Sequence, residues 1–251
     1  IVQRKRFMIQ VTDFRKVYGR TVAVDGIGFE VGAGQVVGLI GPNGAGKTTT
    51  LRALAGIIPP THGQLVVDGH DVVRAPLAAK RQLAFVPDDP ALFDALTVWE
   101  HLEFTASAYR IRDFEAQARG LLKQFELEAK RDAIGQELSR GMRQKVAIAC
   151  AFLQHPRALL FDEPLTGLDP VGIRTIKRMI REHAARGLAV MVSSHLLPLV
   201  EDLCTHLLLL HYGRVRFSGT IDQARQTLAA PHGQASLEDV FFQIMHEQEP
   251  P

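Results

Sequence analysis

Short apolar runs recur along this chain, and segments with helical spacing separate several of them. The runs cover residues 36–40, 158–161, 189–192 and 207–210. Runs of this kind are typical of parallel strands that are buried on both faces of a sheet. Helical spacing over 171–186 and 196–203 separates the last three runs. This alternation of strand and helix predicts a parallel α/β sheet.

The remaining segments follow other patterns. Roughly alternating residues at 7–14, 27–31 and 64–69 predict antiparallel strands, and Phe85-Val86 predicts a further short strand. Between about Pro90 and His155 strand signals vanish, and helical spacing over 98–108, 114–126 and 142–154 predicts a helical insert. Residues 213–219 predict a small terminal hairpin arm. We therefore expect a core (1–86 and 157–222) with an antiparallel β subdomain, a helical subdomain (87–156), and a C-terminal helix (236–246) and tail within 223–251.

Composition narrows the possible partners. The 251 residues carry a net charge of +2, from 29 basic and 27 acidic residues, so no electrostatic footprint for nucleic acid is expected. Cys150 and Cys204 have neither metal-type nor redox-type spacing, which predicts buried thiols in a reducing compartment. No apolar stretch approaches 18 residues, and no signal-like region follows the first charges. We therefore expect a cytoplasmic protein that does not cross a membrane by itself.

One glycine-rich stretch carries the strongest chemical signal. Residues 41–48 fit the pattern G-x-x-x-x-G-K-[ST] without a mismatch, between the apolar run 36–40 and a segment that can be helical until Gly56. A strand, a glycine loop and a helix in this order direct backbone N–H groups at a triphosphate. Lys47 is predicted to reach the β- and γ-phosphates, and the Thr48 hydroxyl to ligate Mg²⁺. The predicted ATP-contacting residues here are Gly41, Pro42, Asn43, Gly44, Ala45, Gly46, Lys47, Thr48 and Thr49.

A second motif ends the apolar run 158–161 with two acids, Asp162 and Glu163. Asp162 would hold Mg²⁺, and Glu163 would polarise the water that attacks the γ-phosphate, as general base or as orienter. A solvated strand end is the common alternative, and the presence of the glycine loop in the same chain favours the site.

A third segment, residues 138–144, places a hydroxyl and a glycine at the start of a helix. Exposed N–H groups there could bind an anion, although simple capping by Ser139 explains the pattern locally as well. The segment resembles the signature motif L-S-G-G-Q of ABC-type ATPases, with Arg140 and Met142 as departures. The resemblance implies that Ser139 and Gly141 contact the γ-phosphate.

Further residues follow the same family in order. Tyr18 matches the aromatic that stacks on adenine, although a core tyrosine is the competing interpretation. Residues 167–169 resemble the loop that crosses the dimer interface, and His195, after Ser194, matches the switch histidine that contacts the γ-phosphate. The family usually places a metal-binding glutamine after residues 85–87, where this chain has Asp88. Aspartate can hold Mg²⁺, but it is shorter and charged, so we expect weaker or differently timed metal engagement.

The resemblance covers nearly all of residues 7–220 and implies a P-loop NTPase (RecA-like) fold. It also implies that two subunits, identical or different, associate head to tail around two ATP molecules, and that they drive a separate membrane permease through a groove near 85–105. The protein would then lie on the inner face of the membrane. Arg140, Met142 and residues 236–241 resemble stand-alone ATPases of bacterial export systems.

Other functions are less well supported. Soluble ABC-type ATPases that act on DNA or the ribosome carry coiled-coil insertions or two ATPase halves, and this chain has neither. A non-hydrolysing regulator would not need Lys47, Asp162, Glu163 and His195 together. Adenine is favoured over guanine, because Asn43 is the only asparagine and the N-K-x-D guanine motif is therefore impossible.

Overall fold

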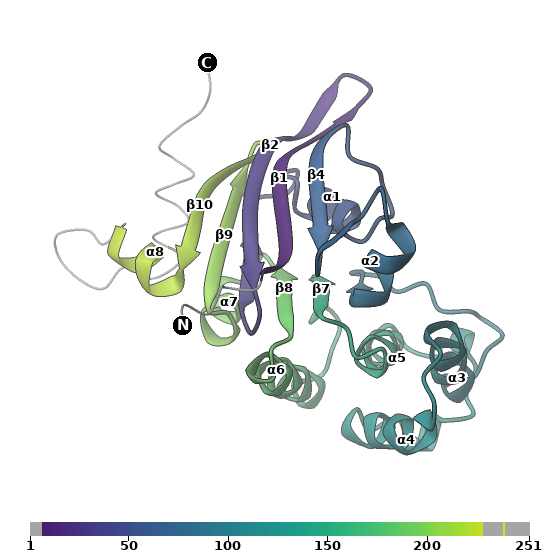
Figure 1. Ribbon diagram of the computed structural model, residues 1–251. Helices are drawn as coiled ribbons and strands as arrows, with labels where there is room; N and C mark the ends of the chain where they lie inside the picture. The colour runs from purple at the N-terminus through teal and green to yellow at the C-terminus, as the bar shows by residue number, and fades with distance from the viewer. Residues whose placement is uncertain (1–6, 228–237, 239–251) are drawn as a thin grey trace, which may run out of the picture.

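The computed structural model describes residues 7–227 and residue 238. Two sheets and the helices around them make up this part of the chain (Figure 1). The strands are β1 (Phe7–Tyr18), β2 (Thr21–Gly32), β3 (Val36–Ile40), β4 (His62–Val67), β5 (His70–Asp71), β6 (Leu83–Val86), β7 (Ala158–Asp162), β8 (Ala189–Ser193), β9 (His206–His211) and β10 (Arg214–Thr220). The helices are α1 (Lys47–Leu54), α2 (Pro76–Gln82), α3 (Val98–Tyr109), α4 (Phe114–Gln124), α5 (Arg140–Leu153), α6 (Pro170–Ala185), α7 (Leu197–Leu203) and α8 (Ile221–Thr227), with 3₁₀ turns at Glu128–Lys130 and Gly135–Glu137.

The larger sheet contains the predicted parallel strands. Its order is β10-β9-β3-β8-β7-β6, with parallel pairing from β9 to β6 and antiparallel pairing between β10 and β9. The smaller sheet, β2-β1-β4-β5, is antiparallel throughout. The α/β fold with a parallel core, an antiparallel β part and a helical part is thus present as expected.

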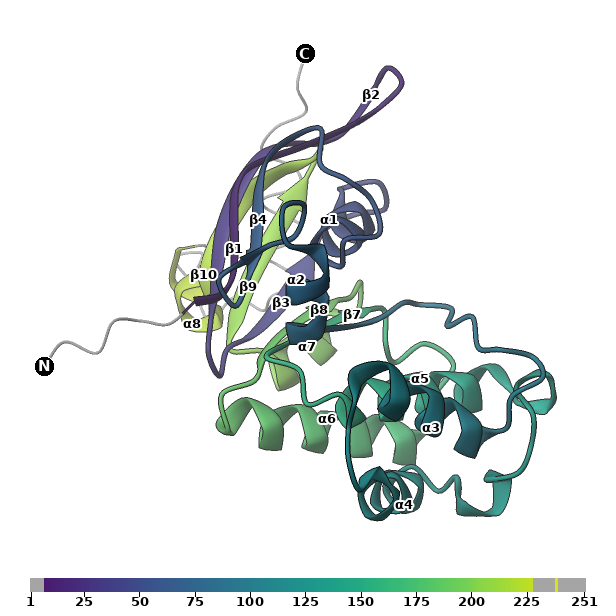
Figure 2. The same cartoon turned by 45° about the vertical axis from the view of Figure 1, so that its right-hand side comes forward.

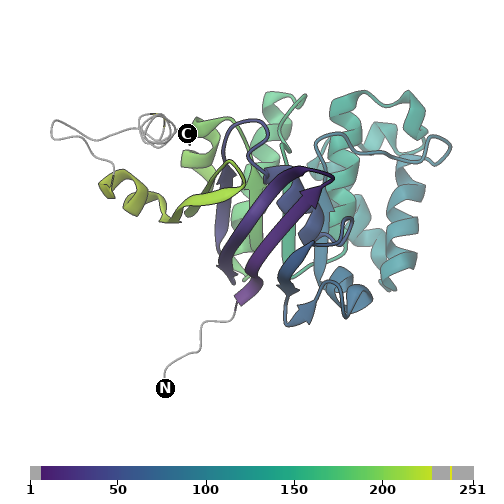
Figure 3. The same ribbon diagram turned by 90° about the horizontal axis from the view of Figure 1, so that it is seen from above.

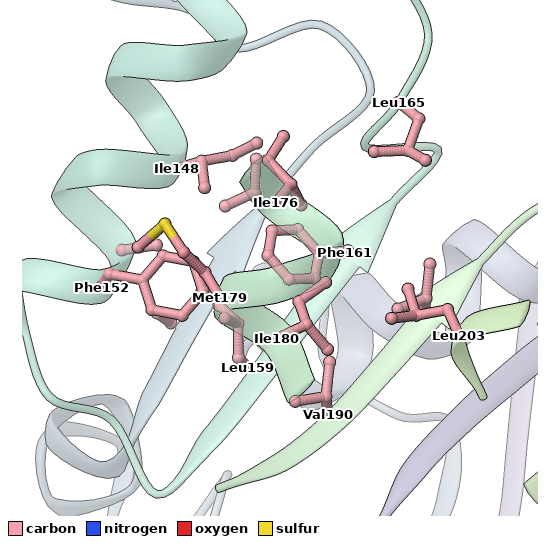
Figure 4. Close-up of a cluster of buried hydrophobic side chains, with 14 of the residues drawn as sticks. Ile148, Phe152, Leu159, Phe161, Leu165, Ile176, Met179, Ile180, Val190 and Leu203 are labelled. Carbon is pink, nitrogen blue, oxygen red and sulfur yellow. The ribbon is translucent and has the colours of Figure 1, made fainter. Parts of the chain in front are cut away.

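Side chains along the central strands point alternately to the two faces of the larger sheet, and each face packs against its own hydrophobic core. In β7, Ala158 and Leu160 face the core shared with α1 and the smaller sheet, whereas Leu159 and Phe161 face the core formed with α5, α6 and α7. Because both faces are covered, every position of β3, β7 and β8 is buried, which explains the continuous apolar runs in the sequence. Figure 4 shows side chains of the second core from α5, β7, α6, β8 and α7 pointing toward one another: Ile148, Phe152, Leu159, Phe161, Ile176, Met179, Ile180, Val190 and Leu203.

Helices α3, α4 and α5 gather at one end of the molecule, beyond β7 (Figure 2). Their apolar faces belong to the same hydrophobic cluster as β7, β8 and α6. Thr97 begins α3 with a capping box, in which its hydroxyl accepts a hydrogen bond from the Glu100 N–H and the Glu100 carboxylate accepts one from the Thr97 N–H. The helical part therefore packs against the sheet through a continuous apolar contact.

Some details differ from the sequence predictions. The hairpin arm expected at 213–219 is present as β10, which pairs antiparallel with β9, but it is an edge strand of the larger sheet. Viewed from above, α8 lies beside β10, at the opposite end from α3 to α5 (Figure 3). Helix α2 and strand β5 were not expected, and the predicted helix 236–246 lies outside the described residues.

Two further expectations concern the cysteines and the membrane. Cys150 and Cys204 are free; Cys204 is buried as expected, whereas Cys150 is only partly buried. Burial raises the pKa values of their thiols to about 11 and about 12. In the part of the chain that the structure describes, no helix has the length and apolar character needed to cross a bilayer.

Candidate functional site

The carboxyl ends of four neighbouring parallel strands bring the predicted residues to one edge of the larger sheet. The glycine loop follows β3, His195 follows β8 closely, Asp162 ends β7, and Asp88 follows β6. Ligands of open α/β sheets bind at this edge, because the loops that leave the strands there converge. The topology therefore assembles residues that are more than 100 positions apart in the chain.

The glycine loop presents helix α1 to solvent without a cap. Gly46 lies at a φ of 101°, and a Cβ there would come within 2.7 Å of the Ala23 carbonyl oxygen, so the position favours glycine. No side chain caps α1, and its first turn contains no acidic residue. The N–H groups of a first helical turn have no partner within the helix, and the positive end of the dipole lies there. The loop thus fits a phosphate anion.

Lys47 points back into this loop. Its ammonium donates hydrogen bonds to the Gly41 carbonyl at 2.6 Å and to the Pro42 carbonyl at 3.1 Å. Burial lowers the pKa of Lys47, and the negative charges of Glu163 and Asp162 oppose this shift. A bound phosphate would add further negative charge beside the ammonium, and this charge, like those of Glu163 and Asp162, would favour the protonated form of Lys47.

Asp162 is held by a serine that the sequence did not single out. The Ser193 hydroxyl donates to Asp162 Oδ1 at 2.5 Å, and the two residues are partners in the β7–β8 pairing. Asp162 is only 5% exposed and Ser193 is fully buried. The strand register decides this contact, and the register cannot be read from one sequence.

An unusual backbone conformation at Glu163 sets the direction of its side chain. Its φ of +47° lies in the left-handed region, which costs a non-glycine residue about 1 kcal/mol or more. The Glu163 N–H donates to the carbonyl and the hydroxyl oxygen of Ser193, each at 3.2 Å. Glu163 Oε1 lies 3.0 Å from His195 Nδ1, and His195 is the more exposed of the two. The structure thus brings the predicted Glu163 and His195 together.

Two adjoining depressions surround these groups and share Asn43 and Glu163. Tyr18, at the end of β1, lies at the rim of the first with its side chain nearly half exposed, and Lys16 Nζ is 4.9 Å from its ring centroid. The first depression is lined by Tyr18, Thr21, Val22, Ala23, Asn43, Gly44, Ala45, Gly46, Lys47, Thr48, Thr49, Asp162 and Glu163. The second is lined by Ile40, Gly41, Pro42, Asn43, Asp88, Arg140, Glu163, Thr166, Ser194, His195 and Leu197.

The oxygen donors in these depressions fit a magnesium ion bound together with a nucleotide. Thr48 and Asp162 line the first depression, and Asp88 lines the second. Among the described residues, no three His, Cys, Asp or Glu side chains form a cluster that could hold a metal by themselves. Mg²⁺ commonly takes one or two protein oxygens and completes its shell with phosphates and water, so this sparse donor set suits it.

The signature segment is arranged differently from the other predicted residues. The Ser139 hydroxyl accepts a hydrogen bond from the Met142 N–H and caps α5, which is the alternative interpretation of this segment. Gly141 packs against the backbone of Gly167, where a Cβ would come within 2.6 Å of the carbonyl oxygen. Ser139 and Gly141 are not among the residues lining either depression, whereas Arg140 is. Sequence reasoning also missed the ion pair of Arg140 with Asp88, at 2.9 Å.

Comparison with known proteins identifies the family that this fold and loop define. Residues 24–166 match the family model described as ABC transporter. The match covers more than half of the chain, and the chain belongs to the ABC transporter family. It is an ATP-binding subunit whose ATP hydrolysis is coupled to transport, and subunits of this family work with transmembrane permease partners.

Individual relatives agree over most of the chain. The Bacillus subtilis (strain 168) protein named ABC-type transporter ATP-binding protein EcsA is 35% identical over 242 residues, which are 96% of this chain and 97% of that protein. The Escherichia coli (strain K12) lipopolysaccharide export system ATP-binding protein LptB is 34% identical, over 82% of this chain and 87% of that protein. A solved structure titled "Structure of ATP binding subunit of ABC transporter" superposes with a TM-score of 0.90 at 34% identity, covering 95% of this chain and 99% of that one.

Proposed function

We propose that this subunit powers an export permease through ATP-driven, head-to-tail dimerisation. The resemblance to an ATPase named for lipopolysaccharide export supports the direction of transport. The observation that carries the catalytic part is the Glu163–His195 pair, which lies beside the Lys47 loop at the shared border of the two depressions.

In this proposal the first depression holds ATP. Tyr18 stacks on the adenine, the loop amides of 41–49 and Lys47 bind the phosphates, and Thr48, Asp162 and Asp88 provide oxygen ligands for Mg²⁺. The metal would neutralise charge on the phosphates. Glu163 accepts a proton from the attacking water or orients that water. His195 contacts the γ-phosphate, and its contact with the Glu163 carboxylate keeps the Glu163 side chain in place.

The dimer follows from what one chain lacks. Ser139 and Gly141 do not line either depression of their own chain, so in this proposal they complete a site in a facing subunit, identical or different. Charge on the γ-phosphate then holds two subunits together, and its loss on hydrolysis weakens them.

The permease is proposed to dock beside α3. Phe93 and Phe104 are each more than half exposed and form an edge-to-face pair with centroids 5.3 Å apart. The buried His101 fixes this surface, because its Nε2 accepts a hydrogen bond from the Phe93 N–H and its Nδ1 therefore donates to the Thr97 carbonyl. An exposed aromatic pair, with Phe93 in an anchored loop and Phe104 on α3, suits an apolar helix end of a partner. This docking would keep the subunit at the cytoplasmic face of the membrane.

Light scattering with a hydrolysis-deficient variant tests the proposal. Glu163→Gln keeps the shape of the side chain and removes its base, so it should accumulate as a dimer with saturating MgATP and return to monomer when the nucleotide is removed. Glu182→Gln, an exposed residue on α6 paired with Arg178, is the matched control and should behave as the wild type. A Glu163→Gln protein that binds MgATP and stays monomeric would rule out the dimer mechanism.

A further inference from the structure

Two departures from the family motifs meet in space. Arg140 replaces a glycine of the signature motif, and Asp88 stands where the family usually has glutamine. Arg140 Nη2 donates a hydrogen bond to Asp88 Oδ1 at 2.9 Å, with both side chains about half exposed. The pair joins the first turn of α5 to the segment after β6, across 52 positions of sequence. The two unusual residues therefore carry complementary charges at one point of the site.

Asp88 on its own would oppose a triphosphate. The second depression already contains the Glu163 carboxylate, beside the loop residues Pro42 and Asn43. A neutral glutamine adds no charge there, whereas an aspartate adds a full negative charge close to the bound anion. Arg140 supplies the opposite charge on the same wall, and it engages only one carboxylate oxygen. Oδ2 is left for a metal ion or its water.

The position of Arg140 is not explained by helix stability. A cation at the first residue of a helix faces the positive end of the dipole, and the first turn of α5 has no acidic residue to offset it. The stem of Arg140 lies beside Gly167, where a Cβ would sit 3.5 Å from Arg140 Cδ. Asp88 therefore provides the compensating charge, and the loop at Gly167 limits where the guanidinium can lie.

We propose that Arg140 is a positioning residue for nucleotide binding: it holds Asp88 against the wall of the second depression and cancels its charge toward the γ-phosphate. Arg140 and Asp88 then act as one unit, and together they replace the neutral glycine and glutamine that the family usually has at these two positions. This inference rests on the proposed placement of the terminal phosphate beside Asn43 and Glu163.

A double-mutant cycle measured by calorimetric binding tests it. The variants are Arg140→Ala, Asp88→Asn and the double variant in the full-length protein, titrated with MgATPγS and with MgADP. Arg140→Ala should weaken MgATPγS binding about threefold to fivefold, the size that a half-exposed ion pair supports, and change MgADP binding by less than about twofold. Adding Asp88→Asn should restore MgATPγS binding to within about twofold of wild type, because the repelling charge is gone and the amide oxygen of asparagine can still serve as an oxygen ligand for the metal. Arg140→Lys, which keeps the charge, should retain most of the affinity.

Controls separate this role from folding and from the proposed function. Arg178→Ala removes another roughly half-exposed arginine, from an ion pair on α6, and should leave both affinities unchanged. Additive effects of Arg140→Ala and Asp88→Asn, or an equal loss for MgADP and MgATPγS, would overturn the pairing even if the wild type binds normally. A wild type that does not bind MgATPγS would instead overturn the placement of the phosphates, and the inference with it. A large loss of melting temperature in Arg140→Ala that Asp88→Asn does not reverse would assign the pair to stability alone.

Discussion

Removing the hydroxyl of Ser193 tests how the buried end of β7 is held. In Ser193→Ala, the Asp162 carboxylate loses the donor that lies 2.5 Å from its Oδ1, in a place where both residues are buried. The Glu163 N–H keeps the Ser193 carbonyl as an acceptor, so the main loss is a single hydrogen bond to a charged group. Such a bond contributes about 1.5–3 kcal/mol, because a buried carboxylate left without its donor cannot recover its hydration.

This loss is large enough to measure by thermal unfolding. For a chain of this size each kcal/mol shifts the melting temperature by about 2–4 °C, so Ser193→Ala should unfold roughly 3–12 °C below wild type without nucleotide. Ser194→Ala is the matched control, because its hydroxyl is equally buried but accepts from the Leu196 N–H and touches no charge. We expect a smaller loss there, of about 0.5–1.5 kcal/mol. Equal melting temperatures for Ser193→Ala and Ser194→Ala would refute the assignment of the cost to the charged carboxylate.

The remaining predictions concern Asp169 at the start of α6, the two thiols, and the docking surface beside α3. Hydrogen bonds from the Gly172 N–H and Lys145 lower the pKa of Asp169, so its stabilisation is present above the unfolded pKa and disappears as pH falls through the folded pKa. Asp169→Asn should lower the unfolding free energy by about 1 kcal/mol at pH 7, and in denaturant titrations the difference should shrink once the pH falls below the ordinary aspartate pKa of 3.8. Because burial raises both thiol pKa values, Cys150 and Cys204 should resist a thiol-specific colour reagent at pH 8 until the protein is unfolded, and rapid labelling of the folded protein would contradict their burial. Phe104→Ser should leave melting temperature and basal ATPase rate near wild type but lose co-purification with a polytopic partner from solubilised membranes, whereas Leu77→Ser, at another exposed apolar residue, should retain it.

The central strands and the glycine loop could be predicted because their signals are local. Strands buried on both faces must be apolar at every position, and β3, β7 and β8 are. The loop motif needs particular backbone angles and close approaches, and glycines supply them at fixed spacing. Helix α2 gave no such signal, since it is seven residues long and buries only Ala79. The hairpin that contains β10 was expected at 213–219, but its place at the edge of the larger sheet was not, because its half-buried or exposed positions leave no apolar run.

The contacts within the site depend on tertiary placement. Asp162 and Glu163 could be predicted from a strand that ends in acids, but Ser193 could not, because its role depends on lying opposite Asp162 in the β7–β8 register. Similarly, the sequence alone indicates only that Arg140 and Asp88 each replace a usual motif residue, with no connection between the two replacements. Only the packing of α5 against the end of β6 shows that their charges compensate each other.

The start of α5 is fastened to the segment that follows Glu163 in the same chain. Gln144 donates to the Pro164 carbonyl at 3.3 Å, Lys145 pairs with Asp169 at 3.0 Å, and Gly141 lies against the Gly167 backbone with no room for a side chain. A displacement of this segment must therefore move the first turn of α5 as well, because close-packed groups do not slide past one another freely. In the proposed dimer that turn completes the partner's site, so the state of the γ-phosphate beside Glu163 in one subunit sets the position of Ser139 at the other nucleotide. A mechanical link of this kind makes the two sites interdependent without any contact between the two nucleotides.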